Sequence, residues 1–333
     1  MVEKPEKEQQ KKFFRLVEAI LPKNASLADE LADVLEISTD SAYRRLRGET
    51  LLNINELSIL CSRYNISFDS LNSLVSDTVT FGYINIEPTT DSFYNYFDRI
   101  YIELSKLNKA GNATIIYSAE DIPLFHLFNF PELARFKLYY WMKSVINVPE
   151  LNSKKYSRDV VSDSFIELGQ KMRDEYYRLS SVEIWSELTI YSICKQIQYC
   201  WEAGFFESKN DLEAVNSELM QLLEQVKGFA ENNKKFTSTI NSFNQNYQLY
   251  SCDFKLGNNC IFITQDEFKT VYLTFNTLNS LNTSNKSFCA DTERWLNVLI
   301  KKTELISGVS EKQRNRFFIK NQQFIHDLIT LVS

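Results

Sequence analysis

Hydrophobic and polar positions alternate with a helical period over much of the chain, and its first quarter predicts a run of short helices. Residues 9–21 place four apolar side chains on one face, and Pro22 ends this helix. A fourth helix begins at Asn53, where Glu56 three residues later completes a capping box. A short fifth helix carries Phe68, Leu71 and Leu74.

The second and third helices are predicted within residues 26–48, where a tight turn joins them. The first of the two has an apolar stripe, formed by Leu27, Leu31, Val34 and Leu35. Ser38 is suited to cap the next helix, whose inner face carries Ala42 and Leu46. The outer face carries five polar side chains: Thr39, Asp40, Tyr43, Arg44 and Arg47. A narrow helix with an apolar back and hydrogen-bonding groups in front suits the DNA major groove.

Residues 26–74 resemble the helix-turn-helix of the lambda-repressor-like superfamily, and especially the xenobiotic-response-element family of bacterial regulators. The matching residues are Leu31-Ala32, Ile37-Ser38, Arg44, Leu46 and Gly48, followed by INELSILCSRYNISFDSL. The resemblance covers under a quarter of the chain and implies a five-helix DNA-binding domain over residues 1–76. Glu36 stands where the family often has glycine, so this residue must adopt a strained backbone or the turn must widen.

A second domain is expected over residues 93–333, after a linker over 77–92. Apolar and polar residues alternate over 79–86, as in a strand, and Pro88 ends this pattern. A helix over 92–109 and a short buried strand over 113–118 should follow.

Most of the second domain predicts a helical bundle. Long helical stretches are expected over 156–180, 182–206 and 209–233, and the middle one is apolar nearly all round, as at the centre of a bundle. Terminal helices are expected over 289–306 and 310–331.

Three short β runs, YQLYSCDF, CIFITQ and KTVYLTF, predict an antiparallel meander, with LGNN as the first turn and the 113–118 strand alongside. A polar loop follows over 276–287. The predicted fold class is therefore mainly α: a five-helix lambda-repressor-like domain plus a larger α+β domain with a helical bundle and a small antiparallel sheet.

Residues 121–146 are the most aromatic part of the chain. This segment either lines a pocket for an apolar effector or simply forms core, since Phe and Leu at helical spacing usually bury against neighbours. His126 is interpreted as a hydrogen-bonded structural residue, because no partner base or metal ligand lies near it in the sequence.

Composition is that of an ordinary globular protein, with 44% hydrophobic and 24% charged residues. No apolar run approaches the roughly 18–20 residues of a membrane span, so no membrane association is expected. The opening MVEKPEKEQQKKFF does not read as a secretion signal, which favours the cytoplasm. The six cysteines form no C-x-x-C pair, so we expect reduced thiols and no metal site; a redox pair of Cys252 and Cys260 is the alternative.

Charge complicates a DNA-binding role. The formal net charge is −6, and residues 1–76 carry 10 Lys and Arg against 12 Asp and Glu. Phosphate contact depends on local clustering, however, since screening limits charge interactions to about 8–10 Å. Arg44, Arg45 and Arg47 form the one dense arginine cluster, and it falls on the predicted recognition helix.

The leading hypothesis is a sequence-specific transcriptional regulator that binds double-stranded DNA as a homodimer. Arg44 and Arg47 would meet guanine edges or phosphates, and Ser38 the phosphate beside the helix start. Thr39 and Tyr43 would contact bases or backbone. Asp40 would accept from cytosine N4 or only cap the helix.

Two alternatives remain open. The helix-turn-helix domain could dock a protein partner instead of DNA, or the larger domain could be an enzyme-like binder of small molecules. The chain lacks the motifs G-x-x-x-x-G-K-[ST], G-x-G-x-x-G, G-x-S-x-G and H-E-x-x-H, and it has only two histidines. We therefore expect no enzymatic activity, no catalytic residues and no cofactor.

Overall fold

The computed structural model describes the chain except for residues 1–4, 22–24, 65, 67–77, 238–244 and 332–333. It contains two compact units, Met1–Thr80 (unit 1) and Phe81–Ser333 (unit 2). Their boundary falls inside the predicted 77–92 linker. The later part of that segment belongs to unit 2, because β1 (Gly82–Tyr83) joins its sheet and α6 (Thr90–Ala110) begins there.

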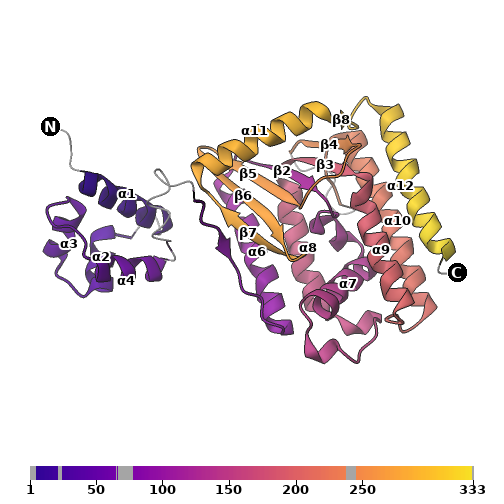
Figure 1. Cartoon of the computed structure of the whole chain (residues 1–333), viewed down its shortest axis with the longest axis horizontal. Coiled ribbons are helices and arrows are strands. Elements are labelled where there is room, and N and C mark those ends of the chain that lie inside the picture. Colours follow the sequence, from indigo (N-terminus) through magenta and orange to yellow (C-terminus); the bar gives the residue numbers. More distant parts are fainter. Residues whose placement is uncertain (1–4, 22–24, 65, 67–77, 238–244, 332–333) are drawn as a thin grey trace. The chain divides into compact units, whose positions relative to one another are not determined.

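Unit 1 consists of helices around one small core (Figure 1). Its described helices are α1 (Pro5–Ile20), α2 (Leu27–Leu35), α3 (Thr39–Leu46) and α4 (Ile54–Tyr64). The buried core takes residues from each of them: Phe13, Phe14, Val17, Leu31, Ala42 and Leu60. These four helices confirm the periodicity argument, with α1 beginning before residue 9. The predicted fifth helix, with Phe68, Leu71 and Leu74, lies outside the described residues.

Unit 2 is organised around a mixed sheet of eight strands in the order β1-β7-β6-β5-β2-β3-β4-β8. After β1 the strands are β2 (Ala113–Ala119), β3 (Ser180–Ser186), β4 (Tyr247–Cys252), β5 (Cys260–Gln265), β6 (Phe268–Phe275), β7 (Asn279–Thr283) and β8 (Glu304–Leu305). The three strands β2, β3 and β4 run parallel, and the remaining pairs are antiparallel.

Helices cover both faces of this sheet (Figure 1). One face packs against α11 (Lys286–Lys302) through a small core that includes Ile184, Phe262 and Leu296. The larger core on the other face includes Ile115 and Trp185. Its helices are α6, α7 (Pro131–Tyr140), α8 (Asp163–Arg178), α9 (Glu187–Glu202), α10 (Lys209–Asn232) and α12 (Glu311–Leu331).

The predicted fold class, mainly α with a small antiparallel sheet, is wrong because the sheet is large and mixed. The prediction of one helix over 182–206 is wrong for its first part, which belongs to strand β3. Only the later part is helical and forms α9. Strand β3 has buried residues on both faces, as strands at the centre of a covered sheet do. A strand that is buried on both faces lacks the alternation of apolar and polar residues, so periodicity alone does not distinguish it from the start of a buried helix.

The predicted meander is correct for β5 and β6 but not for β4. Strand β4 pairs in parallel with β3 instead of forming a hairpin with β5 across LGNN. The third strand of the meander is β7, which lies in the segment predicted as a loop. By contrast, the predicted helix over 92–109 and strand over 113–118 are confirmed as α6 and β2. Among the described helices, none has both the length and the apolar character needed to cross a membrane.

Candidate functional site

The turn between α2 and α3 has the geometry that its sequence requires. Ser26 caps α2, accepting a hydrogen bond from the backbone N–H of Asp29 at 3.4 Å. Glu36 ends α2 in the left-handed conformation, with φ 54° and ψ 43°, so the predicted strain at this non-glycine position is present. Ser38 caps α3 and accepts from the backbone N–H of Ser41 at 3.3 Å.

Helix α3 presents one buried and one exposed face. Ala42 on the inner face is fully buried, and Leu46 is half-buried. All six residues predicted to contact DNA are exposed: Ser38, Thr39, Asp40, Tyr43, Arg44 and Arg47. The structure therefore brings the predicted contact residues together on one solvent-facing surface. We call this set the α3 surface.

The predicted three-arginine cluster contains only two exposed arginines. Arg45 turns away from the α3 surface and forms a two-pronged ion pair with Glu56 of α4, with N–O distances of 3.2 and 2.6 Å. The hydrogen bond from Arg45 lowers the pKa of Glu56, which also closes the predicted capping box with Asn53. Arg45 therefore fixes the end of α3 against α4.

Glu49 lies between the two remaining arginines. Its carboxylate is 2.8 Å from Arg47 Nε and 3.8 Å from Arg44 Nε. All three side chains are about half-exposed, so this carboxylate competes with any phosphate that approaches the arginines. The contact of Glu49 with both arginines was not predicted from the sequence.

Gln10 is a second residue that the sequence analysis missed. It is buried on the core face of α1, donating to the carbonyls of Arg45 and Thr50 at 2.8 and 2.9 Å. Its Oε1 accepts from the backbone N–H of Leu52 at 2.7 Å. The signal was a glutamine that continues the apolar stripe of this helix by one turn toward its N-terminus. Gln10 thus holds the segment that follows α3.

Unit 2 contains a buried polar cluster centred on the Glu183 carboxylate. Four side chains lie within hydrogen-bonding distance of it: Tyr176 hydroxyl at 2.7 Å, His126 Nε2 at 2.8 Å, Trp185 Nε1 at 2.9 Å and Tyr247 hydroxyl at 3.1 Å. Burial is the largest influence on the pKa of Glu183 and raises it, but His126, Lys235 and Tyr176 together hold this pKa below its usual value. His126 is hydrogen-bonded and fully buried, as its structural interpretation requires.

Lys235 is the buried cation beside this cluster. Its Nζ donates to the carbonyls of Tyr176 and Leu179, both at 2.9 Å, and to Ser181 Oγ at 2.7 Å. It also lies 3.9 Å from the centre of the Tyr176 ring. Burial lowers the pKa of Lys235 to about 7.

This lysine should make the stability of unit 2 depend on pH. The unfolded chain keeps the lysine proton to about pH 10.4, whereas the folded protein releases it near pH 7. The unfolded state then binds more protons above pH 7, so the free energy of unfolding should rise with pH. Between pH 7 and 8.5 we expect the parent protein to gain about 1–2 kcal/mol relative to Lys235→Met, measured by urea denaturation. Parallel pH profiles for the two proteins would contradict this.

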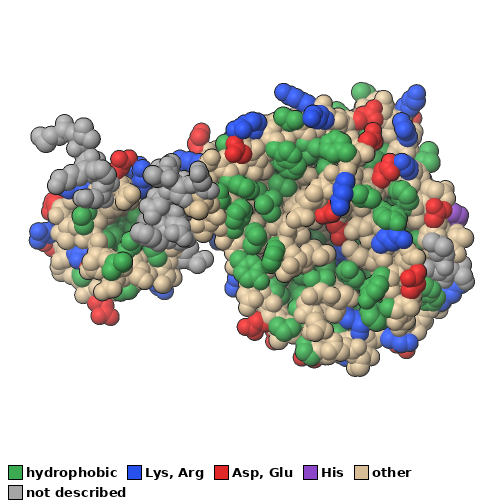
Figure 2. All heavy atoms as spheres, viewed as in Figure 1, with side chains coloured by type: hydrophobic (Ala, Val, Ile, Leu, Met, Phe, Trp, Pro, Cys, Tyr) green, Lys and Arg blue, Asp and Glu red, His purple; other side chains and the backbone are tan. Residues whose placement is uncertain are grey.

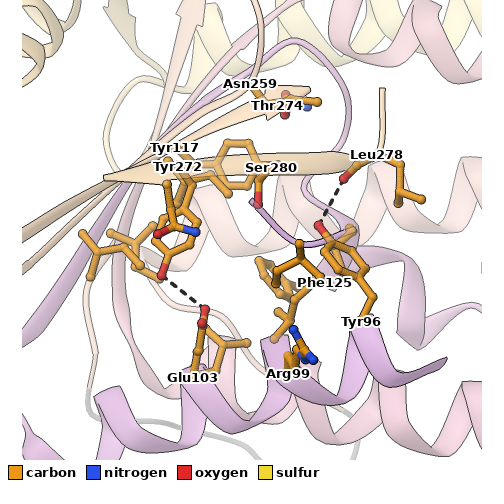
Figure 3. Close-up of a pocket in the computed structure, with 18 of the residues that line it drawn as sticks. Tyr96, Arg99, Glu103, Tyr117, Phe125, Asn259, Tyr272, Thr274, Leu278 and Ser280 are labelled. Carbon is orange, nitrogen blue, oxygen red and sulfur yellow. Dashed lines mark hydrogen bonds between the residues drawn. The ribbon is translucent and has the colours of Figure 1, made fainter. Parts of the chain in front are cut away.

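A cavity of about 330 Å³ lies between α6 and the sheet. In Figure 3, Tyr96, Arg99 and Glu103 extend from α6 toward the strands. Hydrogen bonds between the helix and the sheet side include Tyr272 hydroxyl to Glu103 at 3.2 Å and Tyr96 hydroxyl to the carbonyl of Leu278 at 3.3 Å. The inner walls are largely aliphatic and aromatic.

The aromatic segment 121–146 was expected either to line a pocket or to form core, and each expectation holds for some of its residues. Phe128, Leu133 and Phe136 are buried in the core. Phe125 and Trp141 belong to the same core and also line the cavity. The segment is therefore chiefly structural and contributes one wall of a ligand-sized space.

Among the described residues, neither the cysteines nor the charged side chains form a further candidate functional site. All six cysteines are free, and Cys252 and Cys260 lie on β4 and β5, which are not neighbours in the sheet. The described residues include no group of three or more His, Cys, Asp or Glu placed to hold a metal ion. On the face of unit 2 seen in Figure 2, basic and acidic side chains are interspersed and form no large patch of one sign.

Comparison with known proteins gives no relative: the chain matches no family model, no curated protein and no solved structure.

Proposed function

We propose that this chain is a DNA-binding transcriptional regulator rather than an enzyme, and that it acts in the cytoplasm. Unit 1 reads DNA with the α3 surface, and unit 2 provides oligomerisation and ligand sensing. The observation that carries this proposal is the division of α3 into a buried inner face and an outer face of six exposed, hydrogen-bonding residues. The resemblance of residues 26–74 to lambda-repressor-like helix-turn-helix domains supports the same role.

The residues of the α3 surface divide into two kinds of contact. Arg44 and Arg47 reach guanine edges or phosphates, and Ser38 meets the phosphate beside the N-terminus of α3. Thr39 and Tyr43 contact bases or backbone. Asp40 accepts from cytosine N4. A module this small buries little surface on DNA, so two copies bind half-sites about one helical turn apart.

The direct test is selection of bound genomic fragments with the purified full chain, followed by gel-shift titration of the enriched sequence. The proposal expects a common sequence with repeated half-sites and retention that weakens as salt rises. Fragments without a shared sequence, or no retention even at low salt, would contradict it.

Glu49→Gln should strengthen DNA binding, because it removes the carboxylate that competes for Arg44 and Arg47. We expect a gain of about 0.2–1 kcal/mol, the usual size of an exposed ion pair. Glu18→Gln on the exposed side of α1 makes the same change in net charge and is the matched control. An equal gain in both variants would show that only the net charge of unit 1 matters.

Docking of a protein partner by unit 1 is the second candidate. It is favoured by apolar side chains exposed around α4, where Ile54 is 82% and Ile59 48% exposed. The slight excess of acidic residues in unit 1 also fits this role. Failure to retain DNA at low salt, together with loss of partner capture in Ile54→Ser, would favour this alternative.

A further inference from the structure

The polar groups of the cavity between α6 and the sheet are unequally satisfied. Its two carboxylates have partners: Glu103 accepts from Tyr272, and Asp121 accepts from Lys137 Nζ at 2.6 Å. Several donors do not. Arg99 and Lys106 attract the Glu103 carboxylate electrostatically, but within the described part of the chain no hydrogen bond or close ion pair is found for the Arg99 guanidinium, the Lys106 ammonium or the Tyr117 hydroxyl.

Asn259 adds a further donor. Its Oδ1 accepts from the backbone N–H groups of Glu120 and Asp121, at 2.8 and 3.0 Å. The amide is thereby oriented, and its Nδ2 finds no acceptor among the described residues. The polar group of a ligand therefore gains more in this cavity if it supplies acceptors rather than donors.

The donors and the apolar surface lie at different depths. Arg99 and Lys106 are exposed on α6 at the mouth, one turn on either side of Glu103, which leaves the mouth with one net positive charge. Deeper walls are formed by buried apolar side chains, including Ile115, Ile122 and Phe125. Water in such an interior gains few hydrogen bonds and is readily displaced by an apolar group.

We propose that this cavity binds an amphipathic carboxylate, a molecule with one carboxylate group and an apolar body. The carboxylate lies at the mouth against Arg99, and the body fills the space toward Tyr117. A volume of about 330 Å³ holds on the order of ten non-hydrogen atoms, if each takes the roughly 30 Å³ of a water molecule in the liquid. The role of this ligand as an effector rests on the proposed function, whereas its binding does not.

Decanoate is a suitable probe, and decanol is its uncharged counterpart. Calorimetry on the full chain should show saturable binding of decanoate, with decanol at least about tenfold weaker because it cannot pair with Arg99. Equal affinities for the acid and the alcohol, or no binding of either, would overturn the proposal.

Matched variants locate the site. Arg99→Gln should weaken decanoate binding by about tenfold and leave decanol unchanged. Lys109→Gln removes the same charge from an exposed position of α6 outside the cavity and should change neither. Tyr117→Phe removes a hydroxyl that faces the apolar body of the ligand rather than its carboxylate, so it should leave the affinity for decanoate unchanged or higher. Unchanged decanoate affinity in Arg99→Gln, or a loss in Tyr117→Phe as large as that in Arg99→Gln, would overturn the assignment. These measurements contain no DNA, so failure of the regulator hypothesis would leave them unaffected.

Discussion

Replacing Glu183 with leucine is expected to lower the free energy of unfolding of unit 2 by about 3–5 kcal/mol, the usual cost of removing one partner from a buried charged cluster. The substitution leaves four buried donors without their acceptor, and the ring of His126 loses its anionic partner. Urea denaturation followed by tryptophan fluorescence measures this directly, since all four tryptophans belong to unit 2.

Glu167→Leu is the control for this experiment. It makes the same glutamate-to-leucine change on the exposed side of α8, where loss of the carboxylate leaves no buried donor unpaired. We expect its effect to stay within about 0.5 kcal/mol. A similar loss in both variants, or a loss below about 1 kcal/mol in Glu183→Leu, would show that the polar cluster does not hold the sheet to its helices.

The double variant Arg44→Ala/Arg47→Ala should weaken specific DNA binding by about 2–6 kcal/mol, taking about 1–3 kcal/mol for each base-reading arginine. Neither side chain packs in the core, and each is 56% exposed, so the fold of unit 1 should be retained. Gel-shift titration against the selected operator gives the affinity, and circular dichroism checks the helices.

Arg63→Ala on the exposed side of α4 removes a comparable charge away from the α3 surface. A base-reading role predicts that this control changes affinity little and equally for all sequences. If Arg63→Ala weakens operator binding by half as much as the double variant or more, α3 contributes only general attraction to phosphate. Unchanged affinity in the double variant would remove α3 as the DNA-reading element.

Local periodicity was sufficient for elements that bury one face. Helix α3 was predicted with the correct inner face because Ala42 and Leu46 recur at helical spacing, and α10 was predicted to within one residue at its C-terminal end for the same reason. Strand β3 was missed because both of its faces are covered, which removes the alternation that distinguishes a strand. Strand β7 was missed because its sequence, NSLNT, is almost entirely polar.

Contacts between distant segments could not be predicted from local pattern. The pairing of Arg45 with Glu56 depends on how α4 returns across the end of α3. Glu183 gathers donors from positions as far apart as His126 and Tyr247, and none of them is unusual in its own neighbourhood. The aromatic segment indicated part of the cavity wall, but the charged mouth on α6 follows only from the packing of this helix against the sheet.

The sheet of unit 2 ends at both edges in a strand of only two residues, β1 and β8. Such short edges offer few free backbone groups to a neighbouring chain, so they protect against uncontrolled growth of the sheet into aggregates. A second copy of the protein therefore gains little by extending this sheet. We expect the dimer to assemble through helices, whose side chains alone determine which partner is accepted.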